Sequence, residues 1–169
     1  MKTIRILFIA CLVIAANLSN GQSKSDKMYD VFSNTDGVTS FSFSKNMVDA
    51  INIDVGEYGD EQKVTGDLHQ VRFMSYNPKK GELSGREFTQ KAIGCLPKTQ
   101  YRKYDGKDED EDTEIWLLGR KKKFKECHVF TKNTNDNQIR IVVSFYGDFN
   151  VNDIEDLKSR GDEFTERSE

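Results

Sequence analysis

The stretch QIRIVVSFY (residues 138–146) predicts a β-strand, because its apolar side chains recur at every second position. These apolar residues share one face of the strand: Ile139, Ile141, Val143 and Phe145. Arg140 and Ser144 fall on the opposite face. Successive side chains of a strand point to opposite sides of the sheet, so the pattern predicts a half-buried antiparallel strand with one solvated face.

Four other segments predict the remaining strands of the sheet: residues 38–43, 68–76, 113–119 and 124–131. In the first of these segments, Phe41 and Phe43 are two positions apart and therefore share a face. The polar stretch KNTNDN (residues 132–137) has the composition of a hairpin loop before the strand at 138–146.

The clearest helical pattern is ELSGREFTQKAIGCL, residues 82–96. Its apolar residues recur at helical spacing: Leu83, Phe88, Ala92, Cys95 and Leu96. Gly94 weakens the last turn of this helix, and Pro97 ends it.

Three shorter segments also predict helices. The first covers residues 25–32 with Ser25 or Asp26 as its cap, and its apolar residues are Met28, Val31 and Phe32. The second follows Ser44 over residues 45–51. The third follows Asn150, with Asp153 in its first turn and two inward-facing apolar residues, Ile154 and Leu157.

These elements predict one α+β domain over residues 22–169, because no repeat or linker divides the chain. The expected architecture is an antiparallel sheet of about five strands with helices packed on one face. The final residues, DEFTERSE, predict a frayed acidic C-terminal tail.

The first 21 residues predict a secretory signal peptide. Lys2 and Arg5 precede an apolar run of 11 residues, 6–16, which is shorter than the ~20 residues that a membrane-spanning helix needs. Small residues follow this run, and we expect cleavage after Gly21, which would leave Gln22 as the new N-terminus. The alternative is a buried N-terminal helix or strand.

Cys11 offers a second route of export. FIAC (residues 8–11) loosely resembles a lipobox, in which the cysteine is acylated after cleavage. The apolar run continues for five residues beyond Cys11, however, whereas a lipobox cysteine should end it. We therefore expect soluble export to the periplasm or the outside of the cell, and membrane association only if Cys11 is lipidated.

Charged residues make up 31% of the 169 residues and aromatic residues 11%, a mixture that suits a soluble globular domain. Cleavage after Gly21 would leave 23 basic and 28 acidic residues, a net charge of −5. Phosphate backbones attract an excess of Lys and Arg, so this acidic balance argues against a nucleic-acid partner.

Cys95 and Cys127 remain after cleavage, and export would place them where disulfides form. Cys95 shares a helical face with Phe88 and Ala92, and Cys127 shares a strand face with Val129. Both cysteines could therefore point into the core, either as a disulfide or as two separate buried thiols. The sequence contains no C-x-x-C motif of the redox or zinc-binding kind.

Two charged runs follow each other in DGKDEDEDTEIWLLGRKKKFK, residues 105–125. Asp108, Asp110 and Asp112 have the alternate spacing of an EF-hand loop. Thr113 and Gly119 then occupy the positions where that loop needs Gly and Glu, so an EF-hand is rejected. A weak cation site and a solvated loop remain as alternatives, with the solvated loop favoured.

The basic run GRKKKFK (residues 119–125) could contact phosphate or anionic lipid. Its lysines could instead protect a hairpin from edge-to-edge pairing. We favour a third interpretation, in which the acidic run one strand away neutralises it.

His69 and His128 are the only histidines, and both fall on predicted strands. Two histidines do not make a zinc site, which usually has three or four protein ligands. Cys127 and His128 are strand neighbours that point to opposite faces, which argues against a catalytic dyad. The tripeptide RGD (residues 160–162) is best explained as the end of the last helix, with Gly161 as its C-terminal cap.

Three segments resemble the small exported proteins of Bacteroidota catalogued as domain of unknown function 4252: GVTSFSFSKNM (37–47), KKFKECHVFTKN (122–133) and IRIVVSFYGDFNVNDIEDL (139–157). The resemblance implies export and an α+β fold. In that family a strand that ends in a small residue and Gly leads into a final helix, matched here by Gly147, Asp148 and Phe149. The resemblance implies no agreed activity, so it transfers no catalytic residue; many members look like lipoproteins.

We therefore expect an exported, non-catalytic domain that binds an unknown protein of the periplasm or cell envelope, without cofactor or metal. An enzyme of hydrolase type, using His69 or His128 on the sheet face, is the first alternative. A surface protein that binds calcium weakly through the acidic run is the second.

Overall fold

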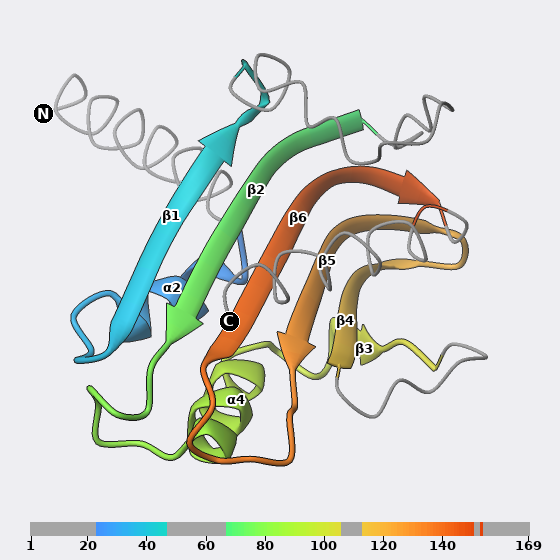
Figure 1. Cartoon of the computed structure of the whole chain (residues 1–169). Coiled ribbons are helices and arrows are strands. Elements are labelled where there is room, and N and C mark those ends of the chain that lie inside the picture. Colours follow the sequence, from blue (N-terminus) through green and yellow to red (C-terminus); the bar gives the residue numbers. More distant parts are fainter. Residues whose placement is uncertain (1–22, 47–66, 106–112, 151–152, 154–169) are drawn as a thin grey trace, which may run out of the picture.

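The computed structural model describes residues 23–46, 67–105, 113–150 and 153. They form a six-stranded antiparallel sheet in the order β1-β2-β6-β5-β4-β3, together with helices α2 and α4 (Figure 1). The strands are β1 (Val38–Ser44), β2 (Asp67–Tyr76), β3 (Tyr101–Lys103), β4 (Thr113–Arg120), β5 (Lys123–Thr131) and β6 (Arg140–Asn150). The predicted α+β class with an antiparallel sheet is confirmed.

The expected number of about five strands is wrong, because β3 adds a sixth. This strand consists of Tyr101, Arg102 and Lys103 and pairs with β4 at the sheet edge. Three residues are too few to show an alternating pattern, and two of them are charged. Strand β3 is therefore identified by its pairing with β4, because its own sequence shows no strand pattern.

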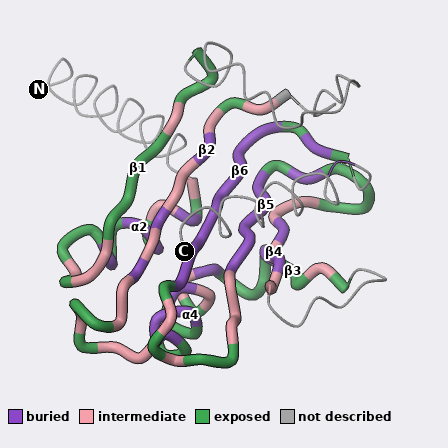
Figure 2. The backbone as a smooth tube through the Cα atoms, in the orientation of Figure 1, coloured by how far each residue is buried: buried purple, intermediate pink, exposed green. Residues whose placement is uncertain are grey.

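Strand β6 lies inside the sheet between β2 and β5 and is buried on both faces along most of its length (Figure 2). The prediction of a half-buried strand is therefore wrong. Arg140 and Ser144, which were expected on a solvated face, are both fully buried. The strand also continues beyond Tyr146 to Asn150, with a register irregularity against β5 between Phe124 and Glu126.

Two hydrophobic clusters pack against the two faces of the sheet. The first gathers ten buried residues from the strands: Val71, Ile115, Leu117, Phe124, Cys127, Val129, Ile141, Val143, Phe145 and Phe149. The second combines strand and helix residues: Met28, Tyr29, Phe32, Met74, Tyr76, Phe88, Ala92, Leu96, Tyr101, Phe130 and Val142. Neighbours such as Val142 and Val143 belong to different clusters, as the alternation of a strand requires.

Helix α2 (Asp26–Phe32) starts after Ser25, close to the predicted start. It buries Met28, Tyr29 and Phe32, but Val31 is 54% exposed. The buried residues of this helix therefore differ from the apolar residues named from the sequence, with Tyr29 in place of Val31. Tyr29 occupies the inward position because its hydroxyl finds buried polar partners on the sheet.

Helix α4 (Gly85–Gly94) begins with a capping box, in which Ser84 Oγ accepts a hydrogen bond from the Glu87 N–H. Glu87 Oε2 in turn accepts one from the Ser84 N–H. Such reciprocal bonds satisfy two backbone donors that a helix start leaves free. The predicted apolar stripe is confirmed, since Phe88, Ala92 and Leu96 are fully buried or nearly so.

Both described helices contribute to the second cluster. The helices predicted at 45–51 and after Asn150 fall largely outside the described residues. At the latter position the Asn150 N–H donates a hydrogen bond to Asp153 Oδ2 at 2.6 Å. In the described part of the chain, no helix is long and apolar enough to cross a membrane.

Candidate functional site

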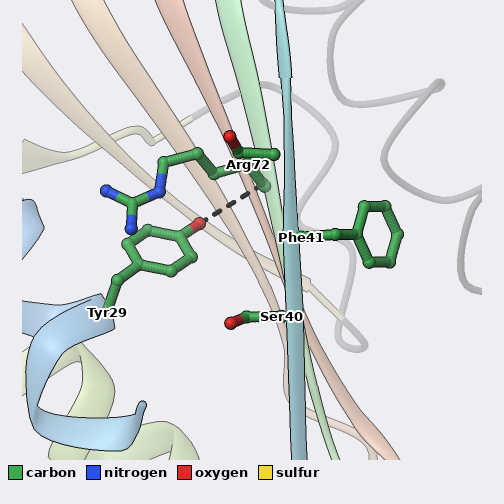
Figure 3. A pocket seen from close by; sticks show the side chains of 5 residues that line it. Tyr29, Ser40, Phe41 and Arg72 are labelled. Atoms are coloured by element: carbon green, nitrogen blue, oxygen red, sulfur yellow. Dashed lines mark hydrogen bonds between the residues drawn. The ribbon is translucent and has the colours of Figure 1, made fainter.

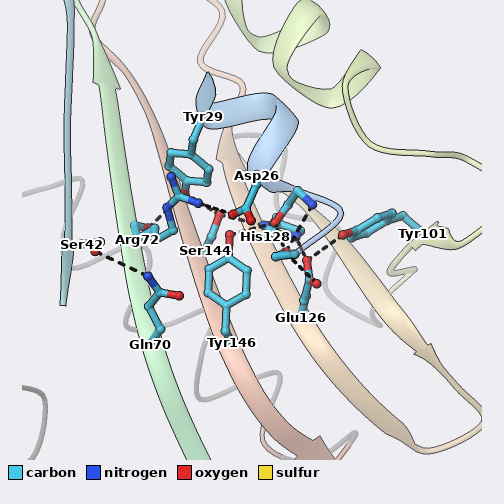
Figure 4. A network of polar contacts seen from close by, with 12 residues as sticks. Asp26, Tyr29, Ser42, Gln70, Arg72, Tyr101, Glu126, His128, Ser144 and Tyr146 are labelled. Atoms are coloured by element: carbon cyan, nitrogen blue, oxygen red, sulfur yellow. Dashed lines mark hydrogen bonds and ion pairs between the residues drawn. The ribbon is translucent and has the colours of Figure 1, made fainter. Parts of the chain in front are cut away.

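A layer of polar side chains lies between α2 and the sheet (Figure 4). We call it the polar cluster. The segment that leads into α2 and α2 itself supply Ser23, Ser25, Asp26 and Tyr29. The strands supply Arg72, Tyr101, Glu126, His128, Ser144 and Tyr146.

Glu126, His128 and Ser144 form a continuous line of contacts at the centre of the polar cluster. His128 Nδ1 lies 2.7 Å from Ser144 Oγ, and His128 Nε2 lies 3.2 Å from Glu126 Oε2. Glu126 and His128 are two residues apart on β5 and so share a face, and Ser144 is the register partner of His128 on β6. The alternation of two neighbouring strands thus creates the arrangement.

Glu126 accepts hydrogen bonds from several elements. Tyr101 donates its hydroxyl to Oε2 at 2.6 Å, and Ser23 donates to Oε1 at 2.9 Å. Burial acts to raise the pKa of this carboxyl, but hydrogen bonds from His128, Tyr101 and Ser23 outweigh it and hold the pKa below its ordinary value. Glu126 is therefore a buried carboxylate that its neighbours keep charged.

Two tyrosines complete the polar cluster, Tyr29 from α2 and Tyr146 from β6. Tyr29 donates its hydroxyl to Ser144 Oγ at 2.6 Å, and the hydroxyls of Tyr146 and Ser25 lie 2.8 Å apart. Burial raises the pKa of both Tyr29 and Tyr146. Both phenols thus remain neutral hydrogen-bonding groups.

Arg72 on β2 marks the rim of the polar cluster. Its guanidinium carbon lies 3.7 Å from the centroid of the Tyr29 ring, and its Nη1 pairs with Asp26 at 2.5 Å. Beside it is a shallow recess of about 180 Å³ toward β1, lined by Tyr29, Ser40, Phe41, Ser42 and Arg72 (Figure 3). Neither Ser144 nor His128 lines this recess.

A serine, a histidine and a carboxylate in contact are the groups that acyl-transfer enzymes use for nucleophilic attack. Here Ser144 and His128 are both 0% exposed. Ser144 Oγ also accepts a hydrogen bond from the hydroxyl of Tyr29. A substrate would have to displace α2 before reaching either group.

Strand β1 presents aromatic rings at one edge of the sheet. Phe41 stacks on Phe73 of β2 with ring centroids 4.7 Å apart, and it contacts Phe43 edge-on at 5.3 Å. Phe41 remains 45% exposed. We call these three rings the aromatic patch.

Residues 29–157 match the sequence model of the family described as Domain of unknown function (DUF4252). The chain belongs to the DUF4252 family. Searches of curated proteins and of solved structures gave no match. The matched range starts within α2 and contains every member of the polar cluster on the strands.

The DUF4252 domain does not bring its two histidines together. His128 is fully buried, and it is level with Ser144 and Arg72 across the sheet. His69 lies three residues farther along β2 and is exposed. The structure agrees with the expectation that Cys127 and His128 point apart, because Cys127 belongs to the first hydrophobic cluster.

Cys95 and Cys127 are both free thiols. Cys127 lies in the first hydrophobic cluster, and Cys95 packs against the second, on the other face of the sheet. The structure therefore contains the second of the predicted alternatives, two separate thiols, and no Cys95–Cys127 disulfide. Burial raises the pKa of Cys127 to about 12.

The two charged runs lie at opposite ends of β4. The described flanks of the acidic run, Asp105 and Thr113, are at one end of this strand, and Arg120 begins the basic run at the other. Eight strand residues span roughly 25 Å. Most of the acidic run lies outside the described residues, so the favoured interpretation that the two runs neutralise each other stays a prediction.

Several predicted features lie outside the described residues of the DUF4252 chain. These are Cys11, the cleavage site between Gly21 and Gln22, most of the acidic run and the RGD tripeptide. Among the residues that are described, no group of three or more His, Cys, Asp or Glu side chains could hold a metal ion.

Sequence reasoning missed the polar cluster, although part of its signal was present. Glu126 and His128 had to share a face once Cys127 and Val129 were placed on the other, and Ser144 lay on the polar side of its strand. The pattern did not reveal that Tyr29, 115 positions from Ser144, would cover that side.

Proposed function

We propose that this protein is an exported, non-catalytic domain that binds an extended segment of another envelope protein along the free edge of β1. The observation that carries the proposal is the chemistry of that edge. Among the residues that the structure describes, β1 is the terminal strand of the sheet; it is uncharged and solvent-exposed, and one of its aromatic side chains is held exposed.

An edge strand offers unpaired backbone donors and acceptors, and proteins usually protect such edges with Lys, Pro, bulges or very short strands. The seven residues of β1, VTSFSFS, contain none of the protective residues. Its pairing with β2 runs from Val38 to Ser44 without a register shift. Added strands use edges of this kind in peptide recognition.

The opposite edge of the same sheet has the protected form. Strand β3 is only three residues long, and two of these residues are exposed cations, Arg102 and Lys103. The contrast within one sheet supports a specific use of the β1 edge, because general exposure would affect both edges.

The aromatic patch adds side-chain contact to backbone pairing. Phe41 and Phe43 alternate with serines, so their rings lie on one face of β1, where Phe73 supports them. A partner strand beside β1 would place its own alternate side chains against these rings, and such cross-strand contacts stabilise a sheet.

The absence of catalysis is part of the proposal, and the state of the polar cluster supports it. Ser144 and His128 are enclosed, and Glu126 is saturated by internal donors. Such a fully bonded buried network fixes the position of α2 on the sheet.

A hydrolase remains the second candidate, because Ser144 contacts His128 and His128 contacts Glu126, the serine–histidine–carboxylate order of a catalytic triad. A fluorophosphonate probe tests it, with the Ser144→Ala variant as the control. The non-catalytic proposal predicts no adduct on the native protein. An adduct mapped to Ser144 would favour the hydrolase.

Export is likewise proposed, on the basis of the N-terminal sequence. Intact mass of the protein recovered from its native host tests it. A chain that begins at Gln22 supports soluble export, whereas a chain that begins at an acylated Cys11 shows a tethered lipoprotein.

A photo-crosslinking residue introduced at Thr39 tests the binding edge in the native host. Matched positions are Arg102 on β3 and Thr134 in the β5–β6 loop, which are both exposed. We expect one discrete adduct with a second protein from Thr39 alone. The same adduct from all three positions, no adduct, or an adduct with a second copy of this chain would contradict the proposal.

A further inference from the structure

The turn between β4 and β5 carries a concentration of positive charge that the proposed function does not use. We define the basic turn as five cations: Arg120, Lys121, Lys122, Lys123 and Lys125. All five are exposed at one end of the sheet (Figure 2). Within the described part of the chain, none of them is in an ion pair, although the whole chain is acidic.

The described residues support neither of two simpler explanations of this charge. The described flanks of the acidic run, Asp105 and Thr113, are a full strand length from the basic turn. That distance is about three times the screening length of about 8 Å at physiological salt, so these flanks do not neutralise the turn. Protection of a sheet edge also fails, because β4 and β5 are both interior strands with neighbours on each side.

The backbone of the basic turn gives an independent indication that lysine is useful there. Lys121 has φ 56°, in the left-handed region that favours glycine. It is the only non-glycine residue with positive φ in the described chain. A side chain kept at a strained position is an indication of a role beyond folding.

Arg102 of the neighbouring strand β3 contacts the basic turn. Its Nη2 donates a hydrogen bond to the Lys121 carbonyl oxygen at 3.1 Å. Its guanidinium carbon lies 4.8 Å from the ring centroid of Phe124, which is buried. The turn is thus tied to the sheet at its positive-φ residue, with a sixth cation beside it.

We propose that the basic turn is a contact surface for anionic phospholipid headgroups. Four of its five cations are lysines, which act as point charges and lack the bidentate fork with which arginine selects a single phosphate. The five cations are exposed along the turn and do not line the recess beside Arg72, so they suit an extended charged surface. Clusters of four to eight Lys or Arg residues bind such surfaces electrostatically.

Vesicle co-sedimentation tests this proposal. The protein is purified from its native host in its processed form. The vesicles contain phosphatidylcholine alone or with about one third phosphatidylglycerol. The test variant is Lys122→Gln/Lys123→Gln, and the control is Lys79→Gln/Lys80→Gln, in an exposed loop after β2. Both variants change the net charge equally, so they separate the local surface from the total charge.

We expect partition into the anionic vesicles only, weakened by added salt. Removal of each cation should weaken it about fivefold, so the test variant binds about 25-fold more weakly than wild type. The control variant should stay within about threefold of wild type. An unchanged melting temperature shows that the test variant is folded.

Equal losses in the two variants would overturn the proposal, as would equal binding to neutral vesicles or none to anionic ones. Displacement by millimolar inorganic phosphate at constant ionic strength would also overturn it, because a discrete phosphate site would then be present. Since the Thr39 crosslink reports on the β1 edge, either proposal can fail without the other.

Discussion

The ring of Phe41 on the edge strand β1 stacks on the ring of Phe73 on β2, with 4.7 Å between centroids and 19° between planes. The stack fixes Phe41 while 45% of its surface stays exposed. A side chain that is both ordered and exposed can contact a partner with little further loss of conformational entropy.

Replacing Phe41 by serine removes this stack. We expect the free energy of unfolding to fall by about 1 kcal/mol, the usual contribution of an aromatic pair. Partner binding should weaken about tenfold or more, since a buried phenylalanine contributes roughly 2 kcal/mol. Urea denaturation measures the first effect, and titration with the crosslinked partner, once purified, measures the second.

Ile139→Ser is the matched control, because Ile139 is 42% exposed and lies far from the aromatic patch in sequence. It should change stability by less than about 0.5 kcal/mol and leave binding unchanged. Equal loss of binding in both variants would show that the aromatic patch has no special role.

The charge of Glu126 should make stability depend on pH. Its pKa in the folded protein lies below the ordinary value of 4.5, so its contribution is present above that pH and is lost as pH falls through the folded pKa. Glu126→Gln should therefore destabilise the protein by about 1–3 kcal/mol at pH 7. Below pH 4.5, the stability of the Glu126→Gln variant should fall less steeply than that of wild type.

Chemical denaturation between pH 3 and pH 7 measures this difference, with Glu82→Gln at an exposed position as the control. Parallel pH profiles for wild type and Glu126→Gln would show that hydrogen bonds do not hold Glu126 charged.

Two glycines of α4 should respond in opposite directions to alanine. A Cβ at Gly85 would lie 2.7 Å from Nε of the fully buried Arg140, so Gly85→Ala should destabilise by about 1–3 kcal/mol. At Gly94 nothing lies within 4 Å, and Gly94→Ala should stabilise by up to about 1 kcal/mol. Thermal unfolding of the two variants measures both signs, and a neutral Gly85→Ala would contradict the described packing around Arg140.

The two thiols should react at different rates. Cys127 is fully buried with its pKa raised to about 12, so iodoacetamide at neutral pH should leave it unmodified in the native protein. Cys95, only partly buried, should react slowly, and both should react in urea. Peptide mass mapping measures the labelling, and a gain of about 2 Da on reduction would instead demonstrate a disulfide.

The sequence was sufficient for the elements whose periodicity is local. The helix through Phe88 and Ala92 and the alternating strand through Val143 were predicted because side-chain spacing alone identifies them. Strand β3 was missed because three residues carry no period. Burial of Arg140 was missed because a strand pattern cannot tell a solvated face from one that another element covers.

The candidate site was less predictable because it depends on contacts between distant segments. Ser23 reaches Glu126 across 103 positions of sequence. Tyr29 lay on a predicted helix, but its sequence position did not indicate that it would meet Ser144 on β6. The free edge at β1 also required the strand order, which the sequence alone did not provide.

Hydrogen–deuterium exchange on the crosslinked complex, compared with the free protein, tests the central claim most directly. A strand added at β1 forms hydrogen bonds with its outward amides, so exchange should slow in Val38–Ser44 and remain unchanged in Tyr101–Lys103. Protection of other surfaces with no change in Val38–Ser44 would contradict binding at the β1 edge.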